Sequence, residues 1–154
     1  NRRVRRAFSA STLSAITIAI RAAERHHDGE IRFALEAALD PMALLRGVTP
    51  RDRAIETFSQ LRVWDTEKNN GVLIYVLLAD RAVEIVADRG IAEQVAPQTW
   101  QDISQRLGAA FRQGAHERGL LDAVDQVGAL LTEHFPARPT ERNPNELPDE
   151  PDVR

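Results

Sequence analysis

The run from Gly71 to Ala79 constrains the fold more than any other stretch of this sequence. Its letters, GVLIYVLLA, are apolar on both faces of a strand, so they predict a central strand that helices cover on each side. Residues 80–82 are short enough for a hairpin turn, and alternating apolar residues follow as far as Ala87. We therefore expect two antiparallel strands within a layered α/β domain.

A further strand and a crossover helix precede this run. Residues 30–39, EIRFALEAAL, place apolar side chains at every second position, which is typical of a strand with one well-buried face. Thr49 and Pro50 then form a typical helix start, and apolar residues recur at helical spacing towards Trp64. A strand–helix–strand crossover in one sheet is normally parallel and right-handed, so the complete sheet should be mixed.

Three more helices complete the predicted domain. A serine cap and apolar residues at helical spacing predict one helix from Ser9 or Ser11 to about His26. Pro97 opens a second helix, and residues 120–131 mark the third. In a chain of 154 residues these elements favour one domain of the α/β class, a small mixed β-sheet sandwiched between α-helices.

The two ends of the chain differ in composition from this domain. Residues 1–8 contain the basic run RRVRR, which at a terminus is more often a solvated segment than a contact to phosphate or lipid. Residues 136–154 are rich in proline and acidic residues and have few apolar ones, which predicts a flexible tail. The expected organisation is a basic N-terminal segment at 1–8, a folded domain at 9–135 and a tail at 136–154.

Charge and composition exclude several classes of protein. A formal net charge of −3 argues against a dedicated nucleic-acid-binding domain, which usually has a strong basic excess. No apolar stretch reaches about 18 residues, so we expect no transmembrane segment and a soluble domain, cytoplasmic or membrane-associated. The absence of cysteine excludes disulfides and thiol catalysis.

Polar residues gather at one predicted edge of the sheet. The starts of the first two strands and the end of the third should meet there, because the first pair is parallel and the hairpin reverses the third. Carboxylate and amide oxygens are the ligands that Ca²⁺ and Mg²⁺ accept, and the candidate metal ligands are Glu30, Asp65, Asn70 and Asp88. Asp28 and Asn69 should arrive at the same edge. The alternative is that these residues only form turns and helix caps.

None of the standard catalytic signatures occurs in the chain. The sequence has no nucleophile elbow, Walker loop, dinucleotide fingerprint or zincin motif. His26 and His27 are adjacent, so on a helix they would point about 100° apart and share a metal poorly. Metal binding by this histidine pair is therefore not expected.

Two stretches resemble a known family. They are GEIRFALEAAL at 29–39 and RAIETFSQLRVWDTEKNNGVLIYVLLADRAVEIVADRGI at 53–91, of which NNGVLIYV and VEIVADRG are the most specific parts. Over about residues 9–135 the chain is similar to the TPM domain family. Its members include a thylakoid-lumen acid phosphatase, photosystem II repair factors, bacterial membrane-associated proteins and a nematode receptor modulator. The resemblance implies an αβα sandwich.

The resemblance also implies two activities at the same edge of the sheet. It implies phosphatase activity for the plant lumen branch and Ca²⁺ binding near the Asn-Gly motif for some bacterial members. The matching positions here are Asp65, Asn70, Gly71, Asp88 and Gly90. The commoner family pattern ends the third strand in Gly-Tyr-Gly-Leu-Glu-Gly, whereas residues 88–93 of this chain read DRGIAE, which is closer to a compact bacterial subgroup. The substitution removes two glycines and adds carboxylates.

Two functional hypotheses follow. The first is a domain that binds Ca²⁺ or Mg²⁺ and acts as an interaction module for a membrane-protein partner within a membrane assembly. The alternative is a metal-dependent acid phosphatase, in which Arg89 would hold the phosphoryl oxygens and Asp65 or Asp88 would orient water or act as nucleophile. The first is favoured because the sequence supplies metal ligands but no complete catalytic set.

Overall fold

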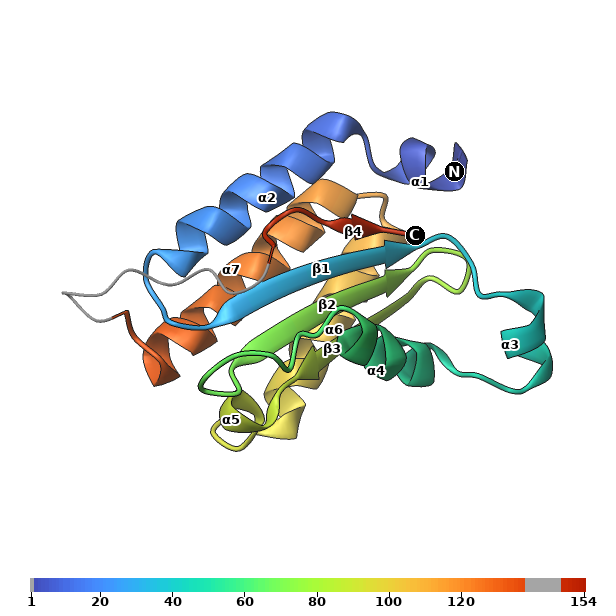
Figure 1. Cartoon of the computed structure of the whole chain (residues 1–154). Helices are drawn as coiled ribbons and strands as arrows, with labels where there is room; N and C mark the ends of the chain where they lie inside the picture. The colour runs from blue at the N-terminus through green and yellow to red at the C-terminus, as the bar shows by residue number, and fades with distance from the viewer. Residues whose placement is uncertain (1, 138–147) are drawn as a thin grey trace.

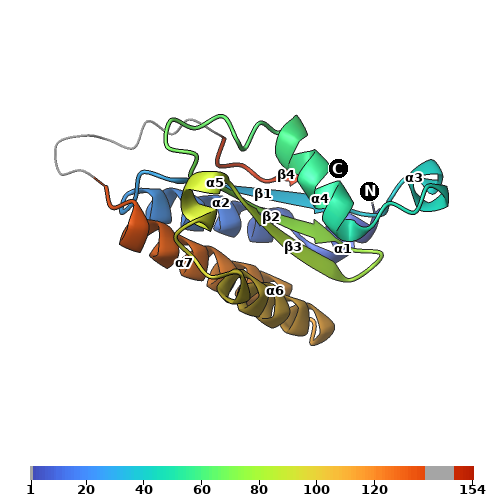
Figure 2. The same ribbon diagram turned by 90° about the horizontal axis from the view of Figure 1, so that it is seen from below.

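The computed structural model describes residues 2–137 and 148–154, which form a single α/β domain with helices on both faces of a mixed sheet (Figures 1 and 2). The strand order is β3-β2-β1-β4. In chain order the elements are α1 (Arg2–Ala7), α2 (Ala10–Glu24), β1 (Glu30–Glu36), α3 (Pro41–Leu45), α4 (Pro50–Gln60), β2 (Gly71–Leu77), β3 (Ala82–Ala87), α5 (Arg89–Ala92), α6 (Pro97–Arg112), α7 (His116–His134) and β4 (Asp152–Val153).

The predicted strand pairing is confirmed. Strands β1 and β2 are parallel and in register from Glu30 opposite Gly71 to Glu36 opposite Leu77. Strand β3 runs antiparallel to β2, with Ala87 opposite Val72 at the edge where the first two strands begin. The starts of β1 and β2 and the end of β3 therefore share one edge of the sheet.

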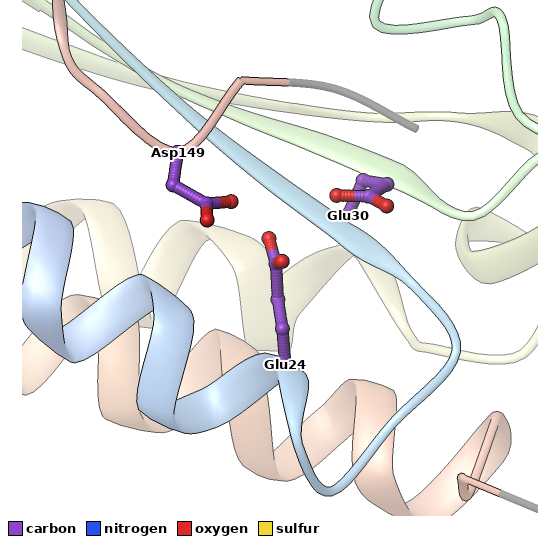
Figure 3. Close-up of side chains that lie close together, drawn as sticks. All are labelled: Glu24, Glu30 and Asp149. Atoms are coloured by element: carbon purple, nitrogen blue, oxygen red, sulfur yellow. The ribbon is translucent and has the colours of Figure 1, made fainter. Parts of the chain in front are cut away.

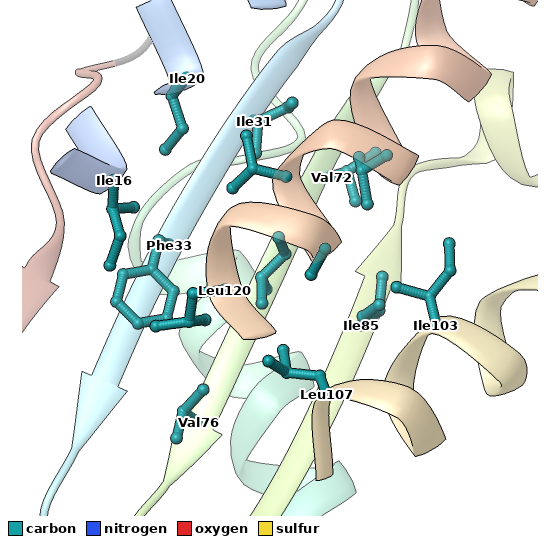
Figure 4. Close-up of a cluster of buried hydrophobic side chains, with 14 of the residues drawn as sticks. Ile16, Ile20, Ile31, Phe33, Val72, Val76, Ile85, Ile103, Leu107 and Leu120 are labelled. Carbon is teal, nitrogen blue, oxygen red and sulfur yellow. The ribbon is translucent and has the colours of Figure 1, made fainter. Parts of the chain in front are cut away.

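Helices α2, α6 and α7 cover one face of the sheet and α4 covers the other (Figure 2). On the first face, alternate residues of β1 such as Ile31 and Phe33 pack against isoleucines and leucines of the three helices (Figure 4). On the second face, Leu73 and Tyr75 of β2 pack against Phe58 of α4. The central strand is therefore buried on both faces, as its unbroken apolar run predicts.

Local sequence signals place the helix starts. Ser9 caps α2 by accepting a hydrogen bond from the Thr12 N–H. Thr49 and Asp52 form a capping box at the start of α4, with Pro50 in the first turn. The short helix α3 was not predicted, because its five residues are too few to show helical periodicity.

Both ends of the chain are more ordered than their composition predicts. The basic segment forms α1 and anchors Val4 and Phe8 in the main core, so it is not simply a solvated tail. The described part of the predicted flexible tail, residues 148–154, also packs on the domain, because β4 pairs in parallel with Ala34 and Leu35 of β1. Residues 138–147 of that tail lie outside the described residues.

The C-terminal segment also corrects the expectation that β1 has only one buried face. Arg32 and Ala34 lie on the face that was expected to be polar, yet both are buried. The Arg32 Nη1 donates hydrogen bonds to the Pro148 and Glu150 carbonyl oxygens at 2.9 and 2.8 Å. The segment thus supplies the acceptors that allow a guanidinium to be buried beside the sheet. Within the described residues, no helix is long and apolar enough to cross a membrane.

Candidate metal centre

Three buried carboxylates meet beside the start of β1. They belong to Glu24 at the end of α2, Glu30 at the start of β1 and Asp149 in the C-terminal segment. One oxygen from each lies within 4.8 Å of the others, and Figure 3 shows the three side chains converging from separate parts of the chain. We call this group the carboxylate cluster.

The turn between α2 and β1 brings the first two carboxylates together. The Gly29 N–H donates to the Nδ1 of buried His27 at 3.0 Å, and the Asp28 N–H donates to the Phe135 carbonyl oxygen at 2.8 Å. Gly29 packs so tightly that a Cβ there would lie 2.6 Å from the Leu131 side chain. The turn is therefore held against the end of α7, and it fixes Glu24 and Glu30 on neighbouring elements.

Two arginines hold the third carboxylate in place. Arg32 binds the backbone on either side of Asp149, as described above. The Arg21 Nε donates to the Asp149 Oδ2 at 3.2 Å, and its Nη2 donates to the Glu150 Oε1 at 2.8 Å. Arg21 is mostly exposed, so solvent screens its charge, and it offsets only part of the negative charge of the cluster.

The cluster holds a proton in the absence of a cation. Burial, and next the charges of Glu30 and Asp149, raise the pKa of Glu24 to about 10 from an ordinary value of 4.5. Burial and the neighbouring charges therefore favour a proton within the cluster at neutral pH, shared among its carboxyl groups. A divalent cation could replace this proton, because it satisfies several carboxylates at once.

The donor set fits a hard divalent cation. Oxygen ligands lie about 2.3–2.6 Å from Ca²⁺ and about 2.0–2.1 Å from Mg²⁺, so two ligands on opposite sides of either ion are about 4–5 Å apart. The spacing within the cluster, at most 4.8 Å, matches this range. Three carboxylates leave further coordination positions for water or carbonyl oxygens. Either cation would find the hard oxygen donors that it prefers.

The structure brings the backbone of the predicted edge together. The Asp88 N–H donates to the Gly71 carbonyl oxygen at 2.9 Å, and the Gly90 N–H donates to the Asn69 carbonyl oxygen at 2.7 Å. The Glu30 N–H faces the Asn70 carbonyl oxygen at 3.4 Å. The loops expected at this edge are therefore neighbours.

The side chains of these loops have different surroundings. Asp65 is exposed and pairs with Arg62 at 2.9 Å, and Arg89 is also exposed. Asp88 caps α5 through its Oδ1, which accepts from the Arg89 N–H at 2.7 Å, while its Oδ2 has no hydrogen-bond partner among the described residues. Asn70 is buried, and neither polar atom of its side-chain amide has a partner among the described residues. Of the four predicted ligands, Glu30 alone belongs to the carboxylate cluster.

The other polar residues of the edge act in the turn. Asn69 adopts a positive φ of 52°, a conformation that asparagine tolerates better than most residues. The Lys68 Nζ lies 2.8 Å from the Asp28 Oδ2, so a protein cation already pairs with this carboxylate. This part of the edge fits the turn-forming alternative.

Sequence reasoning missed Glu24 and Asp149. Glu24 lies within a helical pattern, where a single glutamate is normally exposed, and Asp149 lies in a tail that was expected to be flexible. The sequence signal for Glu24 is its position on the apolar stripe of α2, four residues after Ile20. No local pattern marks Asp149, because its position depends on the long-range docking of β4.

Comparison with known proteins places this architecture in a family. The TPM domain model matches residues 4–130. The NMR structure of the BA42 protein from the psychrophilic bacterium Bizionia argentinensis is similar to this chain, with a TM-score of 0.82 and 32% identity over 96% of this chain and 95% of that one. The N-terminal domain of a protein from P. gingivalis shares the fold, with a TM-score of 0.65 and 23% identity over 85% of this chain and 82% of that one. No curated protein matched. The chain belongs to the TPM domain family.

Proposed function

We propose that this TPM domain binds a divalent cation, Ca²⁺ or Mg²⁺, and serves as an interaction module in a membrane assembly. The observation that supports cation binding is the carboxylate cluster, in which three buried side chains place oxygens within 4.8 Å of one another. Burying like charges together is costly unless a cation or protons compensate them. A divalent ion would compensate two charges at one point.

The carboxylate cluster lies next to the predicted edge of the sheet, so both can belong to one metal site. Glu30 belongs to the cluster and its backbone faces Asn70, whose buried amide has no partner among the described residues. Asn70 is therefore a candidate to complete the coordination from the position just before β2. Asp65 and Asp88 stay predicted ligands, and their positions favour them less than the cluster residues.

Isothermal titration with CaCl₂ and then MgCl₂ tests cation binding. Glu24→Gln and Asp149→Asn each remove one carboxylate while preserving side-chain shape, so we expect each to weaken binding at least about tenfold. Asp65→Asn distinguishes the exposed loop from the cluster, and Glu93→Gln is the matched control on an exposed carboxylate. Wild-type affinity in both cluster variants would reject the site.

Association with a membrane assembly is supported by the family resemblance. A pull-down of the full chain from solubilised source membranes, with and without Ca²⁺, should enrich a membrane protein. An empty pull-down under both conditions would reject this part of the proposal. Calorimetric titration measures cation binding separately from the pull-down. Either the cation-binding part or the membrane part of the proposal can therefore be rejected without the other.

The phosphatase hypothesis stays a prediction. Asp65, a candidate nucleophile, is exposed and paired with Arg62 rather than with a general base. Hydrolysis of an aryl phosphate with Ca²⁺, Mg²⁺ or Mn²⁺ between about pH 4 and 8, lost in an Asp65→Ala, Asp88→Ala double variant, would establish it.

A further inference from the structure

A basic pocket lies at the opposite end of the sheet from the carboxylate cluster. It lies between α1, the β2–β3 hairpin and the turn from α6 to α7, and its volume is about 630 Å³. None of its lining residues is acidic, and five of them are basic or can become so: Arg3, Arg6, Arg81, Arg112 and His116. We call it the arginine pocket.

Three arginines of the pocket carry positive charge that no acidic side chain pairs with in the described part of the chain. Among the described residues, Arg6, Arg81 and Arg112 form no ion pair, and all three are exposed. Helix α7 begins at the pocket with His116, and no side chain caps its first turn. Its free N–H groups add to the positive potential. In a chain with a net charge of −3, the lining of this pocket is a local concentration of positive charge.

An apolar tip projects at the same end of the molecule. Figures 1 and 2 show α3 extending away from the body of the domain, at the end where α1 lies. Met42, Leu44 and Leu45 are 56%, 57% and 81% exposed, and none of the residues of α3 is buried. Arg46 follows directly and is also exposed. Packing in the hydrophobic core does not explain why this five-residue helix carries three large apolar side chains, because all three are exposed.

We propose that this end of the domain docks on an anionic phospholipid surface, with a headgroup phosphate in the arginine pocket and the apolar tip of α3 in the bilayer interface. Arginine suits phosphate because its planar guanidinium can donate two parallel hydrogen bonds. A free phosphate ester would use the arginines but leave the three apolar side chains in water. A bilayer surface accommodates both features, because anionic headgroups lie directly above an apolar layer.

The inference rests on the membrane half of the proposed function and names a lipid surface as one partner there. It does not depend on cation binding, since the carboxylate cluster lies at the other end of β1. The Glu24→Gln variant should therefore bind vesicles like the wild type. Capture of a membrane protein in the pull-down does not test lipid binding. The vesicle assay alone decides whether the domain binds an anionic phospholipid surface.

Vesicle co-sedimentation of the full chain tests the proposal. Phosphatidylglycerol–phosphatidylcholine vesicles should bind the protein at low salt, and pure phosphatidylcholine vesicles should bind it much less. Each arginine near an anionic surface contributes roughly a fivefold factor in partitioning, so Arg81→Gln with Arg112→Gln should reduce binding roughly 25-fold. Leu44→Ser with Leu45→Ser should reduce it by at least about tenfold.

Matched controls separate this surface from general adhesion. Arg25→Gln removes an exposed arginine at the opposite end, and Ile18→Ser removes a side chain of α2 that is 65% exposed. Both should bind like the wild type, and thermal unfolding checks that every variant is folded. Equal losses in controls and test variants would overturn the proposal. Binding of inorganic phosphate by the wild type but not by the arginine variant, without vesicle binding, would also overturn it in favour of a soluble anion.

Discussion

His27 should make the folded domain sensitive to acid. Its side chain is completely buried, and its Nδ1 accepts the Gly29 N–H at 3.0 Å. Burial lowers the pKa of His27 to about 4, whereas an exposed histidine has a pKa of 6.5. The folded protein therefore keeps a neutral imidazole at pH values where the unfolded chain is already protonated.

The size of this effect follows from the difference between the two pKa values. The unfolded chain binds a proton below about pH 6.5 and the folded chain binds it only near pH 4, so the free energy of unfolding falls as the pH falls between these values. Each pH unit is worth about 1.4 kcal/mol, which gives about 3 kcal/mol in total. Above pH 7 the group contributes no pH dependence.

Urea unfolding between pH 7 and pH 4 measures this loss when wild type and His27→Asn are compared. The asparagine oxygen can still accept from Gly29, but the side chain does not titrate. The variant should be less stable at pH 7 because of the missing ring, and its loss on acidification should be about 3 kcal/mol smaller. His26→Asn, at the exposed neighbouring position, is the control. Parallel curves for wild type and His27→Asn would refute the reasoning.

Three further predictions concern the site and its support. Calcium affinity, measured by titration calorimetry, should rise about tenfold per pH unit near neutrality, because each ion displaces the proton that Glu24 holds; a pH-independent affinity would contradict this. Gly71→Ala should cost about 3 kcal/mol or more in chemical denaturation, since its Cβ would lie 2.2 Å from the Val63 carbonyl oxygen, and an unchanged midpoint would show that the backbone can shift. Arg53→Met should cost about 3 kcal/mol at pH 7 by the same measurement, because it leaves the half-buried Glu36 carboxylate without its bidentate partner; a variant as stable as the wild type would show that the ion pair contributes little.

The sheet was predictable from the sequence because its signals are local. The unbroken apolar run of β2, the alternation in β1 and the short link to β3 each depend on neighbouring residues, and their pairing follows from the right-handed crossover. The cap and proline before α4 are equally local. The shared edge of the sheet follows from strand direction alone.

The carboxylate cluster was only partly predictable because its parts meet through long-range packing. Glu30 could be placed from strand direction, whereas Asp149 reaches the cluster only because Arg32 and Arg21 anchor a segment more than a hundred residues away in the chain. Proline and acidic residues predict a flexible tail when they lack partners. Here the partners are Arg32 on β1, which is buried, and Arg21 on α2, which is mostly exposed, and composition reveals neither contact.

The C-terminal segment has one more consequence, which concerns free energy rather than geometry. It supplies Asp149 to the cluster and, three residues later, pairs as β4 with the outer edge of β1. An ion held by Asp149 would therefore strengthen the docking of β4, and loss of the ion would weaken it by the same coupling energy. Because an uncovered strand edge can pair with other chains, cation concentration would then set how often this domain exposes a site for self-association.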